Sequence, residues 1–509
     1  MVDIPRYADT VVVGGGTSGS AVAGLLAAAS DETVLVLEAG PDYGALADRH
    51  WPADLLDARA IADSHDWGYT SGTTYPRRTV PFERARVIGG CSSHNGCAAI
   101  WGHRRDYDDW ETGGLDGWST ADLLPFFAAV TQRARVRNYA PDEVTPFHRR
   151  CLDAAASLGL PLTDNLNDLD ENEGMAASPV NITGGVRWNA ALAYLDPVRD
   201  RPNLSVVGNA AVDRVVVRDG RAVGVVVLGP DGPTEVSAGR VVLSGGTYGS
   251  PAILLRSGIG DPEALRRLGI VPVAGLRGVG RNLHDHPAVT LQHAGSDGLV
   301  SEMRAFAAAN WMPEEQTIAK LRSRVHPAGE AGFDLHVYPV GGPSPGTPGG
   351  WRWQFPVACM TPRSRGSVVL ASADPTVAPL IDHGYLSDPD GHDQAVLVDG
   401  VRIARELAAQ PALATVLGAE TRPGPAARSD RDVAAWVDAS VAHYYHPVGT
   451  CAMGTDPDAG AVVDARGRVH SVEGLTVADC SIIPTVPRAN TNIPALVVGE
   501  RIASWLTET

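Results

Sequence analysis

The stretch Thr10–Gly40, which reads TVVVGGGTSGSAVAGLLAAASDETVLVLEAG, decides the fold of this chain. Its β-branched run Thr10–Val13 predicts a short strand, because branched side chains favour extended backbone. The Ala- and Leu-rich run Ser20–Ser30 predicts a helix, and the apolar run Thr33–Glu38 predicts a second strand. Strand, glycine turn, helix and strand together make a βαβ unit.

Three glycines stand at the turn between the first strand and the helix, in the pattern Gly14-x-Gly16-x-x-Gly19. Glycine lets the backbone turn tightly and approach a pyrophosphate, whose charge meets the helix N-terminus. Glu38 ends the second strand and is placed to accept hydrogen bonds from ribose hydroxyls. The pattern therefore predicts a dinucleotide site, and by itself it fits NAD and FAD equally.

Further strands follow much later in the chain. The runs Leu204–Val207, Val212–Val217, Gly224–Leu228 and Arg240–Leu243 are rich in β-branched residues, and we expect them to return to the nucleotide-binding sheet. The segment Gly341–Gly350 is rich in Gly and Pro and predicts a surface loop.

Composition limits the class of protein. A chain of 509 residues with 44% hydrophobic residues can bury the cores of two or three joined domains. A formal charge of −17 disfavours nucleic acids and anionic membranes as partners. No apolar run is long enough to span a bilayer and no signal peptide is evident, so we expect a cytoplasmic protein. Neither disulfides nor a metal site is expected from the scattered cysteines Cys91, Cys97, Cys151, Cys359, Cys451 and Cys480.

Two segments carry a family resemblance. Ala85–Trp101 (ARVIGGCSSHNGCAAIW) and Gly246–Gly260 (GTYGSPAILLRSGIG) resemble the two signature regions of the glucose-methanol-choline (GMC) oxidoreductases, in which they line a flavin. The string GGCSSHN, with Cys91 and His94, is similar to that of the choline-oxidase-like members. The resemblance runs nearly end to end and includes Gly278–Pro287, Arg363–Gly366, Tyr445–Thr450 and Asn490.

The resemblance implies a mixed α/β fold. A Rossmann-like FAD-binding domain is expected to be interleaved with a substrate-binding domain built on an antiparallel sheet with helices. The expected FAD-binding pieces are residues 1–155, 201–290 and 431–509, and the substrate-binding pieces are residues 156–200 and 291–430.

The implied cofactor is FAD, attached covalently to His94. A covalent imidazole would withdraw electrons from the flavin ring and favour its reduction. The alternative is a buried His94 that hydrogen-bonds beside a noncovalent flavin. The residues expected to bind FAD are Gly14, Gly16, Thr17, Gly19, Glu38, Ala39, Arg86, Gly90, Ser93, His94, Asn95, Gly96, Val212, Asp479 and Asn490.

By the same resemblance, His446 and Asn490 form the catalytic pair. Oxidising an alcohol requires the hydroxyl proton to leave, and an imidazole can accept it near neutral pH. Asn490 can hold the oxygen without competing for that proton. His336 matches a further active-site histidine, and a buried structural histidine remains the alternative for it.

The substrate stays open. Family members that bind choline use a glutamate beside tryptophans, but Ala308 stands in the position of that glutamate here. Trp311, Glu314 and Glu315 follow closely and could serve a differently arranged pocket, or they could form the solvated face of an amphipathic helix. We therefore expect a primary alcohol (choline-like, aryl or furfuryl) or a sugar hydroxyl.

The electron acceptor is also open. Gly96 replaces a serine of the choline-oxidase-like members, and Tyr444 stands where a small aliphatic residue is found. The bulky phenol of Tyr444 could obstruct the space in which oxygen meets the flavin. Oxidation with O2 reduced to H2O2 is the first expectation, and a dehydrogenase that uses a quinone is the second. A nonoxidative flavoprotein lyase is the third, and a homodimer is left open.

Overall fold

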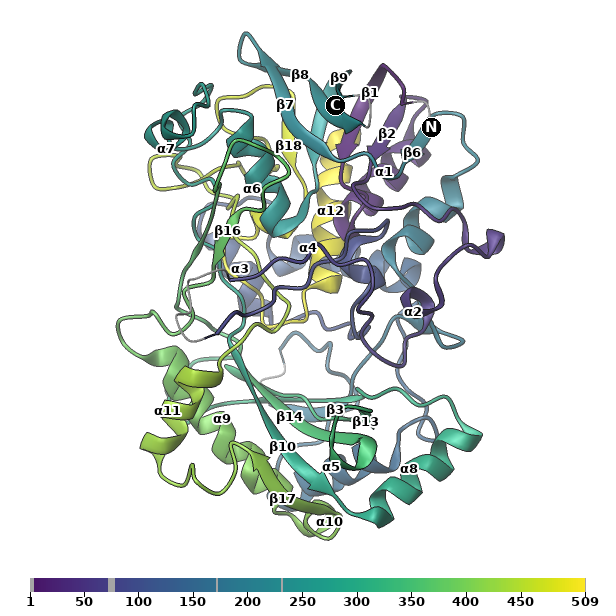
Figure 1. Ribbon diagram of the computed structural model, residues 1–509, viewed down its shortest axis with the longest axis vertical. Helices are drawn as coiled ribbons and strands as arrows, with labels where there is room; N and C mark the ends of the chain where they lie inside the picture. The colour runs from purple at the N-terminus through teal and green to yellow at the C-terminus, as the bar shows by residue number, and fades with distance from the viewer. Residues whose placement is uncertain (1–3, 72–77, 171–172, 230–231, 509) are drawn as a thin grey trace.

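A computed structural model describes residues 4–71, 78–170, 173–229 and 232–508. Figure 1 shows two bodies stacked along the long axis of the molecule. The upper body contains both termini and a sheet flanked by helices, and the lower body contains a second sheet covered by helices.

The sheet of the upper body is built around the predicted βαβ unit. β1 pairs in parallel with β2 on one side, from Thr10 opposite Val34, and with β9 on the other, from Tyr7 opposite Ser237. β6 extends the sheet beyond β2, and β18 pairs in parallel with the end of β9. The parallel strands, in spatial order, are β6 (Leu204–Val207), β2 (Val34–Leu37), β1 (Tyr7–Val13), β9 (Gly232–Leu243) and β18 (Leu475–Val477).

The first half of β9 belongs to an antiparallel meander. β8 (Arg221–Gly229) pairs with β9, and β7 (Val212–Arg218) pairs with β8. All four strand runs expected after residue 200 therefore join the nucleotide-binding sheet, as predicted.

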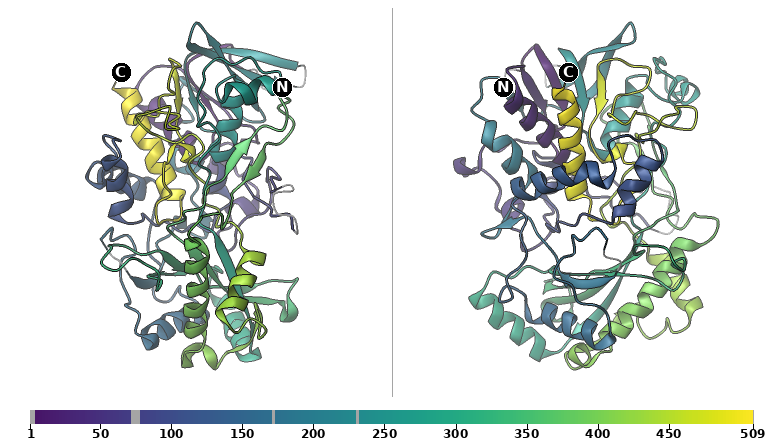
Figure 2. Two further views of the ribbon diagram at one scale, coloured as in Figure 1. Left: turned by 90° about the vertical axis from the view of Figure 1, so that its left-hand side faces the viewer. Right: turned by 180° about the vertical axis from the view of Figure 1, so that it is seen from behind.

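Helices cover this sheet. α1 (Thr17–Ala29) follows the glycine turn and packs against α12 (Asn492–Thr507), as Figure 2 shows from behind. The two helices cross closely, because a Cβ at Gly499 would lie 2.8 Å from the carbonyl oxygen of Ser18. The other helices of this half are α2 (Ala53–Leu56), α3 (Arg104–Thr112), α4 (Thr120–Arg133), α6 (Gly246–Arg256) and α7 (Pro262–Arg267).

The sheet of the lower body is antiparallel throughout. Its central strand β14 pairs with β10, β12 and β13. Its strands, in spatial order, are β17 (Leu417–Arg422), β10 (Ala288–Gly295), β14 (Trp351–Cys359), β12 (Leu335–Val337), β11 (Thr317–Leu321) and β3 (Gly174–Ala177), with β13 (Val340–Pro343) beside β14. Two short hairpins lie outside both sheets: β4 (Ile182–Thr183) with β5 (Val186–Arg187), and β15 (Ser367–Val369) with β16 (Leu380–Asp382).

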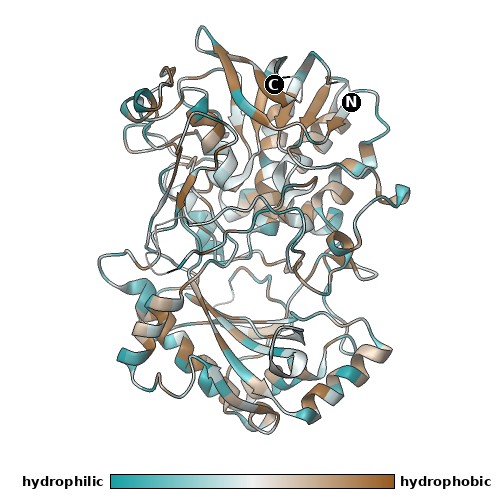
Figure 3. Ribbon diagram, viewed as in Figure 1, coloured by the Kyte–Doolittle hydropathy of each residue, from teal (hydrophilic) through white to brown (hydrophobic). Residues whose placement is uncertain are grey.

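Amphipathic helices cover the antiparallel sheet. Figure 3 shows them with hydrophobic and hydrophilic positions alternating, as expected of helices with one face on a core. They are α5 (Pro146–Leu158), α8 (Asp297–Ala309), α9 (His392–Ala408), α10 (Pro411–Ala414) and α11 (Asp430–Ser440). Within the described ranges, no helix combines the length and the hydrophobicity that crossing a bilayer requires.

The prediction of a surface loop at Gly341–Gly350 is wrong for the first part of that segment. Gly341 and Gly342 are buried in β13, where they pair with β14. A Cβ at Gly341 would lie 2.4 Å from the ring of Phe147, so glycine is needed here because the strand packs closely on that ring. Glycine-rich sequence in this case indicates close packing rather than a turn.

The chain alternates between the two bodies. It contributes β3 to the antiparallel sheet, returns to the parallel sheet with β6–β9, contributes β10–β14 and β17 to the antiparallel sheet, and ends above with β18 and α12. This confirms the mixed α/β fold with interleaved parts. The five segment boundaries stay a prediction.

Candidate active site

The glycine turn is shaped by its neighbours. Gly14 has a φ of +93°, and a Cβ there would lie 2.4 Å from the carbonyl oxygen of Ser244, at the end of β9. A Cβ at Gly19 would lie 2.0 Å from the carbonyl oxygen of Gly14, so this glycine permits close helix–strand packing. A Cβ at Gly16 meets no atom closer than 3.8 Å, which leaves the outer side of the turn open.

Glu38 lies buried where β2 ends, beside the turn. Its carboxylate accepts hydrogen bonds from the backbone N–H groups of Gly15 (2.9 Å) and Gly40 (2.8 Å). Burial raises the pKa of Glu38, and these two bonds oppose the shift. Each carboxylate oxygen can accept more than one hydrogen bond, so Glu38 can also receive a ribose hydroxyl.

The segment that precedes His94 crosses over the glycine turn. The N–H of Gly89 donates to the carbonyl of Gly15 (2.7 Å), and a Cβ at Gly90 would lie 2.7 Å from the Cα of Gly16. Ser92 N donates to the hydroxyl of Thr17 (3.3 Å). The predicted cofactor residues of both motifs therefore lie together. Ser93 is buried and donates to the carbonyl of Ile88 (3.0 Å), which holds this segment in its short helix.

His94 follows directly and is 7% exposed. Among the described residues, its Nε2 has no hydrogen-bond partner. Burial lowers its pKa. The next residue, Asn95, turns back on its own chain and accepts from the N–H of Cys97 (3.1 Å). His94 thus presents a neutral nitrogen that nothing in the described chain uses.

His446 and Asn490 meet as the sequence predicts. The Nδ2 of Asn490 lies 3.4 Å from the Nε2 of His446, and the Nδ1 of His446 lies 3.0 Å from the Nδ1 of His286. When Asn490 donates to Nε2, the Nδ1–H of His446 donates to His286. His446 then carries its lone pair on Nε2, on the side that faces Asn490.

The three histidines here are buried and share one electrostatic environment. Burial lowers the pKa of His446 well below 6.5, and His286 and His336 add to the shift. Burial also lowers the pKa of His286 to about 3 and that of His336 well below its usual value. All three are therefore neutral near pH 7, and His446 is able to accept a proton.

His336 lies in β12 and is completely buried. Its ring stacks on Phe333 with centroids 5.4 Å apart, and neither ring nitrogen has a partner among the described residues. His336 also contributes to the lowered pKa of His446.

Asp285 and His286 both contact His446, and the sequence prediction did not include either residue. Asp285 accepts from the backbone N–H of His446 (3.0 Å) and from the hydroxyl of Tyr385 (3.2 Å). The side chains of Asp285, His286 and His446 each offer a ligand atom within 4.8 Å of the others, but these atoms are engaged in hydrogen bonds. The string HDHP in Gly278–Pro287 was the available signal, since two histidines flank an acid there.

Three residues predicted to bind the cofactor have side chains that pack against or hydrogen-bond to other parts of the chain. Val212 is buried in β7 opposite Val227. The exposed Arg86 lies over the ring of Trp67 at 4.8 Å and donates to the carbonyl of Ala39 (3.2 Å).

Asp479 is the third of these residues. Its carboxylate accepts from the N–H of Gly246 (2.9 Å), at the start of α6, and from the hydroxyl of Ser250 (2.6 Å). Burial raises its pKa, and these bonds oppose the shift. Asp479 therefore acts here as a helix-capping residue next to the end of β18.

Glu314 and Glu315 do not lie on a helix. The alternative that they form the solvated face of an amphipathic helix is therefore wrong. α8 ends at Ala309, and both acids follow it in extended chain. Glu314 is buried and pairs with Arg352, and the carboxylate of Glu315 reaches Gly96. Helical periodicity failed here because Pro313 interrupts the run.

Comparison with known proteins supports the family resemblance seen in the sequence. The models of the GMC oxidoreductase family match residues 8–288 and 362–499. The chain is 34% identical to the oxygen-dependent choline dehydrogenase of Brucella anthropi, over 98% of this chain and 95% of that protein. It is also 34% identical to the mitochondrial choline dehydrogenase of Mus musculus, over 97% of this chain and 88% of that protein.

Solved structures agree with this fold. Pyridoxine 4-oxidase from Mesorbium loti superposes with a TM-score of 0.87 at 28% identity and covers 99% of both chains. Formate oxidase from Aspergillus oryzae, a structure that concerns FAD modification, superposes with a TM-score of 0.85 at 25% identity, covering 100% of this chain and 99% of that one. With its glycine turn, its interleaved sheets and these matches, the chain belongs to the GMC oxidoreductase family and is an FAD-dependent oxidoreductase that acts on alcohols.

Proposed function

We propose that this protein oxidises a primary alcohol and passes the electrons to O2, which yields the aldehyde and H2O2. The observation that carries the proposal is the pair His446 and Asn490, whose Nε2 and Nδ2 lie 3.4 Å apart with the lone pair of a neutral imidazole between them. Such a pair can bind a hydroxyl oxygen and remove its proton.

The chain's own residues would divide this work. Nε2 of His446 takes the hydroxyl proton, and Asn490 donates to the oxygen as negative charge develops on it. His286 accepts from Nδ1–H of His446 and so fixes the tautomer and the ring plane. Bound FAD supplies the acceptor for the hydride that leaves the alcohol carbon.

The residues at the glycine turn fit FAD. Gly16 leaves the outer side of the turn open, and Glu38 has acceptor capacity beside it. We further propose that FAD is bound covalently to His94, whose buried Nε2 has no partner among the described residues. Yellow colour should remain with the protein after acid precipitation and should pass to the supernatant in H94A. Release of the colour from the unmodified protein would refute the bond.

The first experiment is anaerobic mixing of the holoenzyme with alcohols of different classes while the flavin absorbance is followed. We expect one class to bleach the flavin and air to restore it with formation of H2O2. H446A should slow the bleaching by about 10²- to 10⁴-fold and keep its FAD, whereas replacing the exposed His50 by Ala should change neither. Unchanged bleaching in H446A would remove His446 from the mechanism.

A dehydrogenase is the second candidate, and Tyr444 is the observation that favours it. Its ring centroid lies 4.9 Å from that of His446, so a bulky side chain borders the reacting groups. The relatives are named both as choline dehydrogenases and as pyridoxine 4-oxidase, so their names support either acceptor. Bleaching that air does not reverse, but a quinone does, would establish the dehydrogenase. No bleaching by any alcohol would favour the nonoxidative lyase.

A further inference from the structure

The carboxylate of Glu315 lies against the segment expected to hold the flavin. A Cβ at Gly96 would lie 2.1 Å from Oε2 of Glu315, so the carboxylate occupies the space that any other residue at position 96 would fill. Gly96 is two residues from His94. Glu315 is therefore next to the reacting region although it comes from the other body of the fold.

Buried tyrosines surround this carboxylate. The hydroxyl of Tyr338 donates to Oε2 of Glu315 (2.7 Å), and the hydroxyl of Tyr139 lies 3.5 Å from the backbone carbonyl of Glu315. Tyr444 packs edge-on against Tyr338 with centroids 6.3 Å apart. Because Tyr444 also contacts the ring of His446, the tyrosines connect Glu315 to the catalytic pair.

Tyr444 has an unused polar group. The residue is 8% exposed, and its hydroxyl has no hydrogen-bond partner among the described residues. Burial raises its pKa, and the charge of Glu315 contributes, so the hydroxyl lies close enough to sense this carboxylate. A buried hydroxyl without a partner costs free energy, which a ligand that donates a hydrogen bond would offset.

Among the described residues Glu315 makes no ion pair, and the guanidinium of the buried Arg187 donates to backbone carbonyls. Burial and the neighbouring Glu314 raise its pKa to about 7, and Tyr338, Arg352 and Arg187 only partly oppose this shift. The near cation, Arg352, already pairs with Glu314. An ionised carboxylate in this position is therefore destabilised until a cation approaches it.

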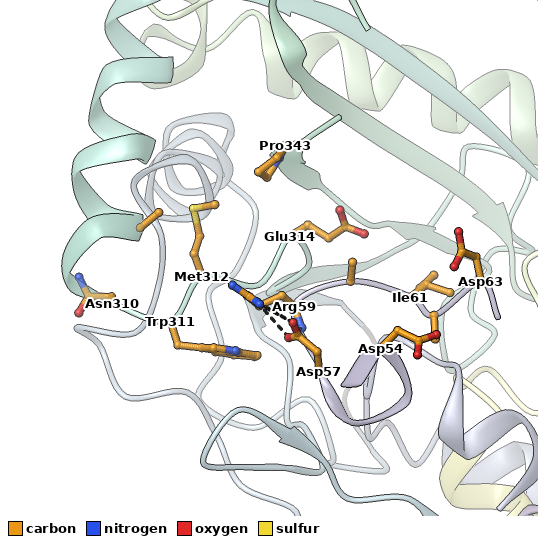
Figure 4. Close-up of a pocket in the computed structure, with 13 residues that line it drawn as sticks. Asp54, Asp57, Arg59, Ile61, Asp63, Asn310, Trp311, Met312, Glu314 and Pro343 are labelled. Carbon is orange, nitrogen blue, oxygen red and sulfur yellow. Dashed lines mark hydrogen bonds and ion pairs between the residues drawn. The ribbon is translucent and has the colours of Figure 1, made fainter. Parts of the chain in front are cut away.

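An acidic cleft is lined in part by Glu314, the residue that precedes Glu315. Its volume is about 490 Å³, and Figure 4 shows carboxylates from both bodies around it. Arg59, the cation in the lining, pairs with Asp57 at 2.9 Å. The other lining residues with a carboxylate are Asp54, Asp63 and Glu314, beside the apolar Ile61, Trp311 and Met312.

Two backbone hydrogen bonds connect this cleft to the site. Ala62 N donates to the carbonyl of His94 (2.9 Å), and Glu314 N donates to the carbonyl of Arg59 (3.0 Å). Glu314 faces the cleft, and Glu315, the next residue, faces Gly96. A cation drawn into the cleft is thus brought to the residue next to Glu315.

We propose that Glu315, Tyr338 and Tyr444 bind the protonated amine of a short amino alcohol whose hydroxyl lies between His446 and Asn490. This inference rests on the alcohol oxidation proposed above and names its substrate class. Aromatic faces and a carboxylate attract any cation. The two acceptors, the carboxylate of Glu315 and the free hydroxyl of Tyr444, in addition require N–H donors, so a primary or secondary ammonium is preferred over a quaternary one.

The test compares three substrates of similar size in anaerobic flavin reduction: ethanolamine, choline and the neutral 1-propanol. In the unmodified holoenzyme, ethanolamine should reach half-saturation at a concentration about tenfold or more below the other two. E315Q should raise the half-saturating concentration of ethanolamine by about 10- to 100-fold and change that of 1-propanol less than twofold. Replacing the exposed Glu263 by Gln is the matched control for the loss of one negative charge, and it should change neither.

A second variant tests the geometry without removing the charge. G96A places a methyl group where the carboxylate lies, so it should raise the half-saturating concentration of ethanolamine about tenfold more than that of 1-propanol. G346A, where a Cβ meets nothing within 4 Å, is its control. Equal losses for both substrates in E315Q or G96A would show a structural role and overturn the inference, as would choline binding more tightly than ethanolamine.

Binding of propylammonium separates this inference from the proposed reaction, because that cation has no hydroxyl. Calorimetry on the holoenzyme should show propylammonium binding that E315Q weakens by the same 10- to 100-fold. If no alcohol reduces the flavin but this binding is seen, the proposed reaction fails and the cation site stands. If alcohols reduce the flavin and propylammonium does not bind, the cation site fails alone.

Discussion

The imidazole of His446 is neutral because of where it is buried. Burial and the neighbouring His286 and His336 hold its pKa well below 6.5. A general base must be unprotonated, so lowering its pKa keeps it active as the pH falls. With a neutral alcohol, kcat/KM should therefore stay constant from about pH 8 down to about pH 6, as measured by steady-state rates. A loss of half the activity near pH 6.5 would indicate an ordinary, solvated histidine as the base.

Glu315 should make the stability of the protein depend on pH. Its folded pKa is about 7 against 4.5 for the free side chain, so the folded state holds this proton more tightly than the unfolded state does. The free energy of unfolding is therefore lowered by the ionisation of Glu315. This loss is absent below pH 4.5 and grows as the pH rises to 7. The titratable and charged groups that interact with Glu315 are Glu314, Tyr338, Arg352, Arg187, Tyr139, Cys97, Tyr444 and Tyr445.

E315Q removes this loss. It should be more stable than the unmodified protein by roughly 2 kcal/mol at pH 8 and nearly equal to it at pH 5, as measured by urea unfolding of the holoenzyme. Equal destabilisation at both pH values would mean that the hydrogen bond from Tyr338 outweighs the buried charge.

Single residues also show the limit of sequence reasoning. His446 and Asn490 could be found because each lies in a recognisable string, and the structure places them 3.4 Å apart. Glu315 could not be assigned, because its role depends on the absence of a side chain at Gly96, more than 200 positions away. His286 could not be assigned either, since its partner is 160 residues later in the chain.

Among the elements, α1 and α12 carry the most specific contact. Both helices are apolar around most of their surface, and Gly499 allows them to cross without a side chain between them. The sequence predicts α1 from its composition and its glycine turn, and it starts three residues earlier than expected because the helix extends up to Gly16. The strands of the meander were predicted with similar success, since β-branched runs fill them.

G499A tests that crossing. Its Cβ would lie 2.8 Å from the backbone oxygen of Ser18, which a helix cannot move alone, so we expect a loss of about 1–3 kcal/mol and weaker retention of FAD. G249A, in α6, meets nothing within 4 Å and should stabilise by about 0.5–1 kcal/mol through helix propensity. Thermal unfolding of both variants gives the comparison. Equal effects in the two would show that the α1–α12 contact is not tightly packed.

At the scale of the whole molecule, charge should govern substrate entry. The formal charge is −17, and the cleft of Figure 4 is lined by four carboxylates and one guanidinium. A cationic substrate should be attracted through solvent, and salt screens that attraction. We expect kcat/KM for ethanolamine to fall severalfold between about 20 mM and about 500 mM NaCl, while that for 1-propanol stays constant. Identical salt profiles would mean that the cleft plays no part in entry.

The alternation of the chain between its two bodies bears on how the protein is made. The glycine turn and α1 are synthesised well before α12, yet α1 packs on α12. The edge strand β18 and the residues His446 and Asn490 also follow every strand of the antiparallel sheet in the chain. A nascent chain therefore cannot complete the packing around its nucleotide turn until α12 has been synthesised, so we expect the flavin to be held firmly only after that point.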